Sequence, residues 1–238
     1  MTEQLAFPNL SMAAARARMS FDVDVHAVST PAGTYTGDFY YTSRSPGGYF
    51  FALGDVAGKG IQAAVLTATI HEELEHRLPG AKSCDDIRAT LGWIEKSLRP
   101  QIPFNRFVSM VFGRIDSNDN LHLINAGHPP VLIVRKNDSV EALGPTGPVV
   151  GMIQGAKWRS TLHRLRSGDS LVAFTDGALE ALSPAGEELG LEPIIEGMCR
   201  APKHNARSIS RAFTDLVGRH QAGTRPHDDM TVLTLRVQ

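Results

Sequence analysis

The sequence predicts an α+β layered sandwich built on antiparallel sheets. Three observations support this fold class: strand-like segments come in runs, short polar turns join successive strands, and two pairs of helix-like segments stand apart from each other. Regular alternation of strands and helices would instead indicate a parallel βαβ fold. No internal repeat or break in composition divides the 238 residues. We therefore expect a single domain over residues 21–238, after a short lead-in over residues 1–20.

The first elements are a short helix and three strands. Residues 13–18 favour a small N-terminal helix. Apolar and polar side chains alternate from residue 21 to residue 26, which is typical of a half-buried strand. Two further strands are expected over residues 39–43 and 49–53, because the Pro46-Gly47-Gly48 segment between them is a hairpin signal.

The first pair of helices is expected over residues 61–78 and 85–98, on either side of Pro79-Gly80. Both segments show the three- and four-residue spacing of apolar side chains that is typical of an amphipathic helix. On the first helix, the residues expected on the buried face are Ile61, Val65, Ala68 and Leu74. On the second helix, they are Ile87, Leu91, Ile94 and Leu98.

Residues 107–175 are rich in strand-forming residues and turn signals, and we expect three successive hairpins there. The predicted strand pairs are 107–115 with 121–126, 131–135 with 140–143, and 158–165 with 170–175. Trp158 alternates with Leu162 and is expected in the core. The second pair of helices follows over residues 191–200 and 206–219, and an alternating strand over residues 230–237 ends the chain.

The composition is that of an ordinary globular protein, with 42% hydrophobic and 21% charged residues. The formal net charge of −1 does not favour a nucleic acid or a membrane surface as the main partner. Cys84 and Cys199 lack metal-type or redox-type spacing, so we expect reduced structural thiols. No secretory signal or membrane-length apolar run is visible, and we therefore expect a cytoplasmic protein.

Four aspartates stand beside glycines or at the ends of strand-like runs: Asp38, Asp55, Asp176 and Asp228. A carboxylate is costly to bury without a partner, and a divalent cation such as Mg²⁺ or Mn²⁺ is a suitable one. Two such ions about 3.5–4 Å apart can activate a water for in-line attack on phosphorus. The order of the four aspartate motifs predicts a two-metal phosphoester hydrolase, and a mechanism without a protein nucleophile suits a chain that has no Ser-His-Asp or paired Cys-His pattern.

Five motifs in a fixed order carry a resemblance to a known family. They are Gly37–Tyr40, Gly54–Gly60 with Ala63-Ala64 after it, Asn125–Pro130, Gly168–Leu171 leading to Phe174–Ala181, and Asp228–Val232. At these motifs the chain resembles the metal-dependent protein phosphatases of the PPM (protein phosphatase type 2C) family, in particular the bacterial SpoIIE/RsbU-type branch. The resemblance spans residues 21–237. One such motif alone would be weak, whereas five in order are specific.

The resemblance implies an α-β-β-α sandwich, with two antiparallel sheets flanked by helix pairs, and two Mn²⁺ or Mg²⁺ ions. It implies that Asp55 bridges the ions, that the Val56 carbonyl completes the shell of one, and that Asp176 and Asp228 hold the other. Asp38 would act mainly on waters of the ions. Asp228 and Asp229 would point to opposite faces of a strand, so only one of them is expected to be a direct ligand. The family pattern favours Asp228 and leaves Asp229 a structural hydrogen bond.

The resemblance also implies a substrate class. Members of this family remove phosphate from serine or threonine, and members of this branch act on small STAS-domain proteins, the anti-anti-sigma factors of partner-switching pathways. No sensor domain fits ahead of the first predicted strand. We therefore expect regulation by a separate activator, by a homodimer formed through residues 61–98, or none.

Three departures from the family pattern keep other functions open. Thr36 replaces a frequent glycine, Tyr41 a frequent acidic residue and Lys59 a frequent histidine. The first two motivate an alternative, a catalytically weak binding module that docks a signalling partner. A third reading is a hydrolase of small phosphoesters. His128 could be a general acid, but a structural hydrogen bond in a turn is favoured, and Lys59 is expected to be a solvated loop residue.

Overall fold

The computed structural model describes residues 22–33, 36–45, 48–58, 60–81, 83–102 and 106–238. The helix expected over residues 13–18 and the side chain of Lys59 therefore lie outside the described residues. No helix within these ranges combines the length and the apolar character that a membrane span requires. The elements are β1 (Val23–Thr30), β2 (Asp38–Ser45), β3 (Gly48–Val56), α1 (Ile61–Arg77), η1 (Leu78–Gly80), α2 (Cys84–Leu98), β4 (Val108–Ile115), β5 (Asn120–Ala126), β6 (Val131–Val134), β7 (Val140–Leu143), β8 (Thr161–Arg164), β9 (Ser170–Phe174), η2 (Asp176–Ala178), α3 (Leu191–Cys199), α4 (Ala206–Gln221) and β10 (Met230–Val237).

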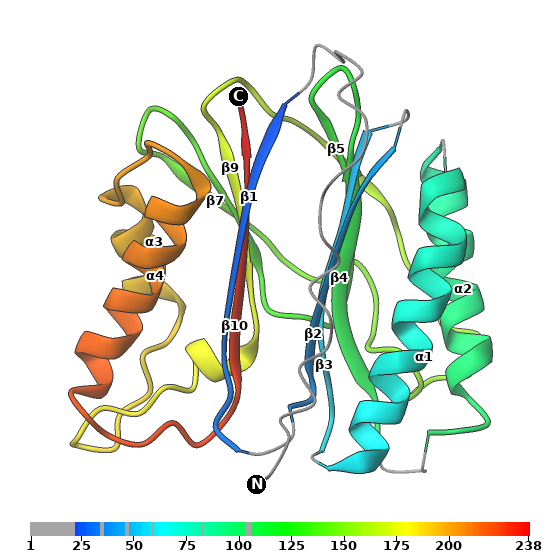
Figure 1. Ribbon diagram of the computed structural model, residues 1–238, viewed down its shortest axis with the longest axis horizontal. Coiled ribbons are helices and arrows are strands. Elements are labelled where there is room, and N and C mark those ends of the chain that lie inside the picture. The colour runs from blue at the N-terminus through cyan, green and yellow to red at the C-terminus, as the bar shows by residue number, and fades with distance from the viewer. Residues whose placement is uncertain (1–21, 34–35, 46–47, 59, 82, 103–105) are drawn as a thin grey trace, which may run out of the picture.

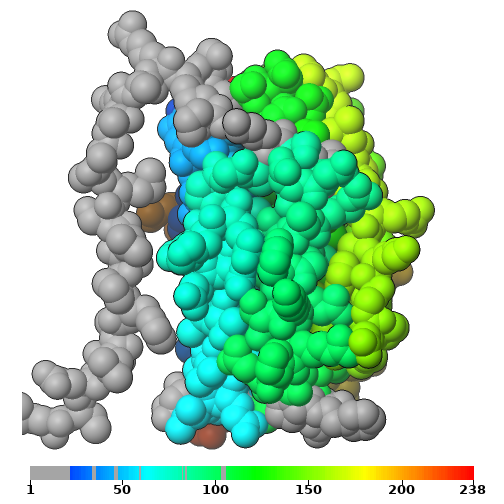
Figure 2. Space-filling model, turned by 90° about the vertical axis from the view of Figure 1, so that its right-hand side faces the viewer, coloured from blue at the N-terminus to red at the C-terminus, as the bar shows by residue number. Residues whose placement is uncertain are grey.

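The strands form two five-stranded sheets that face each other, with a pair of helices on each outer face (Figure 1). One sheet has the order β1-β10-β9-β6-β7 and is covered by α3 and α4. The other has the order β2-β3-β4-β5-β8 and is covered by α1 and α2, which form the cyan and green face in Figure 2. Every pairing of named strands is antiparallel. The predicted α+β sandwich, with two antiparallel sheets flanked by helix pairs, is confirmed.

The core has three apolar layers, one between the sheets and one under each helix pair. Strand β3 shows the arrangement: Phe50 and Ala52 pack toward α1 and α2, whereas Phe51 and Leu53 pack toward the other sheet. Because successive side chains of a strand point to opposite faces, a sheet covered on both sides needs continuous apolar runs. The alternation seen in β1 fits its place at an edge, where its side chains are only partly buried.

The third predicted hairpin is wrong. Strand β8 pairs with β5 in one sheet, and β9 pairs with β6 and β10 in the other, so residues 165–169 cross between the sheets. The turn residues in this segment predict a change of chain direction, but they do not determine which strands β9 pairs with. Trp158 is buried, as expected, and donates a hydrogen bond from Nε1 to the Pro148 carbonyl at 2.6 Å. It precedes β8, however, and Leu162 is exposed.

The buried face predicted for α1 is also wrong, apart from Leu74. Ile61 is 70% exposed and Val65 is 49% exposed. Apolar residues occur on more than one side of this helix, so their spacing alone does not select the face that meets the sheet. The buried residues of α1 are Ala63, Leu66, Ile70 and Leu74. On α2, the predicted stripe of Ile87, Leu91, Ile94 and Leu98 is confirmed.

The orientation of α1 can be tested with two neighbouring substitutions. Leu66→Ala should lower the free energy of unfolding by about 2–5 kcal/mol, because it leaves a cavity under the sheet. Val65→Ala, the matched control on the exposed side, should change it by less than about 0.5 kcal/mol. Urea unfolding of both variants measures the two values. Equal losses would mean that α1 is rotated relative to the described orientation.

Candidate metal centre

The four predicted aspartates meet at one end of the two sheets, the lower end in Figure 1. Asp38 begins β2, and Asp55 lies directly opposite it near the end of β3. These two side chains therefore project from the same face of neighbouring strands. Asp176 begins η2 directly after β9, and Asp228 stands two residues before β10. The site thus takes two carboxylates from each sheet.

Close backbone packing brings the second pair of aspartates together. A Cβ atom on Gly177 would lie 2.0 Å from the Asp229 carbonyl oxygen, so only glycine allows η2 to approach the segment before β10. Asp176 is thereby held beside Asp228. In the other sheet, Gly58 and Gly60 adopt the positive φ expected of the turn that follows Asp55.

A hydrogen bond between the sheets fixes Asp38. Thr175 Oγ1 donates to Asp38 Oδ2 at 2.9 Å, and it accepts a hydrogen bond from the Thr231 amide at 2.9 Å. No role for Thr175 is predicted from the sequence. The local signal for a role was its hydroxyl, directly before Asp176 at the end of a buried strand. Its hydrogen-bond partner, Asp38, lies 137 residues away in the chain. Thr36, which replaces the frequent glycine, accepts a hydrogen bond from the Asp38 amide at 3.0 Å.

In the metal-free protein, burial and neighbouring negative charges favour the neutral forms of Asp55, Asp38 and Asp176. Burial, and then the charges of Asp38, Asp176, Asp228 and Asp229, raise the pKa of Asp55 to about 8. Burial raises the pKa of Asp38 to about 7, although hydrogen bonds from Thr231 and Thr175 oppose the shift. The pKa of Asp176 is raised by burial and by the nearby charges of Glu180 and Asp228. Within the described ranges, no Lys or Arg forms an ion pair with Asp38, Asp55 or Asp176.

The oxygen atoms around Gly37 are suited to a hard cation. A Cβ atom at this position would lie 2.6 Å from Asp55 Oδ1 and 2.7 Å from the Val56 carbonyl oxygen, so both oxygens converge on space that glycine leaves free. No group of three His, Cys, Asp or Glu side chains in the described part of the chain is arranged to hold a metal ion by itself. Mg²⁺ usually keeps several waters and binds one or two carboxylates, so this donor set fits it.

Asp228 and Asp229 differ in their surroundings. Asp229 is buried, and its Oδ1 accepts a hydrogen bond from the Ala32 amide at 2.7 Å. Asp228 is partly exposed, and its Oδ1 accepts a hydrogen bond from the Asp229 amide at 3.0 Å. Asp229 therefore ties the start of β10 to the chain beyond β1, whereas Asp228 remains more open to solvent. Tyr41, which stands where the family pattern frequently has an acidic residue, is half-buried and packs edge-on against His71 of α1.

His128 forms a buried link beside the site. Its Nδ1 lies 2.9 Å from Oγ of Ser109, and Ser109 lies directly opposite Asp55 in the sheet. The His128 amide donates to Asn125 Oδ1 at 2.8 Å, which fixes the turn after β5. Burial lowers the pKa of His128 to about 3, a shift that the Phe174 backbone only partly opposes. A ring that stays neutral and inaccessible supports a structural hydrogen bond rather than a general acid.

Repulsion among the carboxylates predicts an unusual response to pH in the metal-free protein. The pKa of Asp55 is higher in the folded chain than its ordinary value of 3.8, so the free energy of unfolding should fall as pH rises from about 4 to about 8. In chelator at pH 8, Asp55→Asn should raise the melting temperature by about 2–4 °C for each kcal/mol of repulsion removed. The gain should vanish near pH 5. Asp215→Asn, on the outer helix α4, should leave the melting temperature unchanged at both pH values. An Asp55→Asn variant that is less stable than the native chain at pH 8 would contradict the prediction.

His128 predicts the opposite pH dependence. Its pKa is lower in the folded chain than its ordinary value of 6.5, so the stability it contributes is complete at neutral pH and is lost as pH falls below about 6.5. His128→Gln should be less stable at pH 7 by about 1–3 kcal/mol. Its deficit relative to the native chain should shrink by about 1–2 kcal/mol between pH 7 and pH 5. A deficit that stays constant in urea unfolding would show that the ring titrates normally, and the exposed His204→Gln serves as control.

Comparison with known proteins agrees with this geometry. A family model described as Stage II sporulation protein E (SpoIIE) matches residues 45–238, most of the chain. Protein IcfG of Synechocystis is 28% identical over 237 residues, which cover 89% of this chain and 37% of IcfG. The phosphoserine phosphatase RsbU of Bacillus subtilis is 26% identical over 219 residues, which cover 90% of this chain and 63% of RsbU. The chain thus spans less than two thirds of the length of these relatives.

Solved structures share the fold. The SiaA-PP2C domain of Pseudomonas aeruginosa superposes with a TM-score of 0.78 at 20% identity, over 89% of this chain and 85% of that domain. The phosphatase domain of SpoIIE from Bacillus subtilis, solved with a fragment of its regulatory domain, gives a TM-score of 0.77 at 20% identity, over 92% of this chain and 64% of that one. Together with the match over residues 45–238, these findings show that the chain belongs to the SpoIIE family of PPM-type phosphatases.

Proposed function

We propose that this chain is a metal-dependent serine/threonine phosphoprotein phosphatase, with one phosphatase domain over residues 21–238. The observation that carries the proposal is the meeting of aspartates from both sheets, with raised pKa values and no cationic side chain paired to three of them in the described ranges. RsbU and RsbP are both named phosphoserine phosphatases, and a related structure, RsbX, was solved in complex with magnesium. These names support the proposed chemistry.

The roles of the residues follow from their positions. Asp55 and the Val56 carbonyl converge beside Gly37 and would hold one ion, with Asp55 reaching toward a second. Asp176 and Asp228, held together by the packing at Gly177, would hold the second ion. Asp38 is kept in place by Thr175 and would orient water at the centre. Asp229 would position the strand by accepting a hydrogen bond from the Ala32 amide, which supports Asp228 as the direct ligand.

Two bound Mn²⁺ or Mg²⁺ ions would supply an activated water and the positive charge that phosphoryl transfer requires. The surrounding residues would contribute fixed geometry, because Thr175 holds the Asp38 carboxylate, Thr36 holds the Asp38 amide, and Gly177 allows close backbone packing beside Asp176. The low solvent exposure of Asp38 and Asp229 would strengthen their interaction with cations. No protein nucleophile is required in this scheme.

The proposed substrate is a phosphoserine or phosphothreonine of a STAS-domain protein in a bacterial partner-switching pathway, in the cytoplasm. The substrate proposal rests on the family, since the relatives RsbU and RsbP act on phosphoserine by name. Control by a separate activator or by a homodimer through α1 and α2 is part of the proposal. A catalytically weak module that only docks such a partner is the alternative, and metal affinity separates the two.

The first test measures phosphate release from a phosphoserine-bearing STAS-domain protein, with Mn²⁺, with Mg²⁺ and with chelator. We expect release only with metal and a fall of at least about 100-fold in Asp55→Asn. Asp215→Asn should retain full activity. Calorimetric titration with Mn²⁺ on the same samples should show binding to the native chain and weakened binding to Asp55→Asn.

Two results would overturn the proposal. An Asp55→Asn variant with native metal-dependent turnover, or a native chain that releases phosphate equally well in chelator, would contradict the assigned mechanism. Weak metal binding together with binding of the phosphorylated protein would favour the docking module. Turnover of a generic aryl phosphate equal to that of the phosphoprotein would instead indicate a hydrolase of small phosphoesters.

A further inference from the structure

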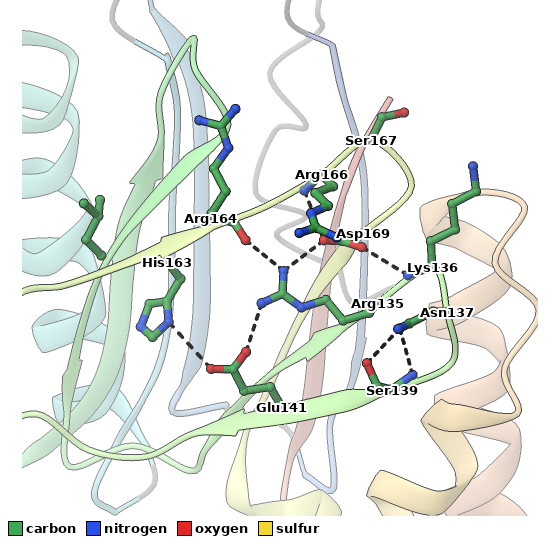
Figure 3. Close-up of a pocket in the computed structure, with 11 residues that line it drawn as sticks. Arg135, Lys136, Asn137, Ser139, Glu141, His163, Arg164, Arg166, Ser167 and Asp169 are labelled. Atoms are coloured by element: carbon green, nitrogen blue, oxygen red, sulfur yellow. Dashed lines mark hydrogen bonds and ion pairs between the residues drawn. The ribbon is translucent and has the colours of Figure 1, made fainter.

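A second site lies at the other end of the sandwich. A cavity of about 820 Å³ opens between β7 and β8, the outermost strands of the two sheets (Figure 3). Arg164, at the end of β8, pairs with Asn120 at the start of β5, and so lies far along the sheet from Asp55. None of the residues lining the cavity belongs to the aspartate site. The cavity therefore serves neither metal binding nor the proposed chemistry.

The floor of the cavity is a closed polar network. Arg135 donates from Nη1 to Asp169 Oδ2 at 2.9 Å and to the Arg164 carbonyl at 2.8 Å, and from Nη2 to Glu141 Oε2 at 2.9 Å (Figure 3). Asp169 is buried and also accepts hydrogen bonds from the Lys136 and Arg166 amides. The charge of Arg135 is thus already balanced, and its guanidinium holds the two edge strands together.

The rim carries positive charge that is not balanced in this way. Lys136, Arg164 and Arg166 are exposed, and none of the three forms an ion pair within the described residues. Their side chains come from the turn after β6, from β8 and from the segment after β8, and those of Lys136 and Arg164 extend outward from different sides of the cavity (Figure 3). Positive groups around a concave surface attract anions more strongly than the same groups on a convex one. A chain with a net charge of −1 therefore presents a local cationic rim.

The arrangement selects among anions. A single phosphate favours donors that converge on one point, but the guanidinium of Arg135 is committed to Asp169, Glu141 and a carbonyl. Single-stranded nucleic acids bind through aromatic platforms, and the described residues that line the cavity include no Phe, Tyr or Trp. Several carboxylates spaced along a peptide match the three separated cations of Lys136, Arg164 and Arg166.

The edge strands favour an extended ligand. In the described part of the chain, β7 and β8 each pair on one side only, and an outer strand can accept an extended peptide through its backbone. Leu162 of β8 is 62% exposed at the cavity and offers an apolar contact. We propose that the cavity between β7 and β8 binds an extended acidic segment of a partner protein.

The test uses the full chain and a fluorescein-labelled hexaglutamate peptide, with binding followed by fluorescence anisotropy in chelator. We expect saturable binding that weakens as ionic strength rises from about 0.05 M to 0.5 M. The triple variant Lys136→Glu, Arg164→Glu, Arg166→Glu should bind at least about tenfold more weakly. Neither Glu141 nor Asp169 is altered, so the floor network should remain intact.

A matched control carries the same change in total charge elsewhere. The triple variant Lys157→Glu, Arg207→Glu, Arg219→Glu reverses three exposed cations outside the cavity and should keep native affinity. Equal losses in both variants, no binding by the native chain, or binding of a single-stranded oligonucleotide in preference to the peptide would overturn the proposal. Metal-dependent phosphate release from a small aryl phosphate should be the same in all three proteins. This readout separates failure of the acidic-segment site from failure of the proposed phosphatase.

Discussion

Mutual repulsion among clustered aspartate carboxylates is the constraint on which the structure at the aspartate end of the sandwich depends. Asp38 and Asp55 face each other on neighbouring strands, and the opposing sheet adds Asp176 and Asp228. Burial and shared negative charge raise the pKa values of Asp38 and Asp55 to about 7 and about 8. A protein interior tolerates a charged carboxylate when hydrogen bonds and packing hold it in place and a cation compensates its charge. The fold supplies the first condition, and divalent metal would supply the second.

Both sheets contribute contacts that hold the carboxylates in place. The hydrogen bond from Thr175 to Asp38 crosses from one sheet to the other, and the contact between Gly177 and the Asp229 carbonyl brings η2 against the strand end. His128 adds a neutral link to Ser109, beside Asp55. Each link joins segments that the three-layered core has already brought close together. Packing sets the distance between the sheets, and these polar contacts set the orientation of the side chains.

The two ends of the sandwich balance clustered charge in different ways. At the aspartate end, carboxylates cluster, and no Lys or Arg of the described ranges forms an ion pair with Asp38, Asp55 or Asp176, an arrangement suited to metal. At the other end, Arg135 joins the edge strands through Asp169 and Glu141, and the floor is neutralised within the protein. The surplus charge there lies on an exposed rim, where water screens it at little cost. The first end is thus suited to chemistry and the second to docking.

Local patterns in the sequence predict the type of most elements and single out the four aspartates that lie at one end of the sheets. Periodicity and turn residues are local properties, and the motifs around Asp38, Asp55, Asp176 and Asp228 are local as well. Tertiary structure decided which sheet β8 joins, which side of α1 is buried, and that Thr175 reaches Asp38. These choices depend on which arrangement buries the most apolar surface over the whole chain, and the partners are distant in sequence. Local patterns cannot contain that information, because the same turn or helix could serve either arrangement equally well.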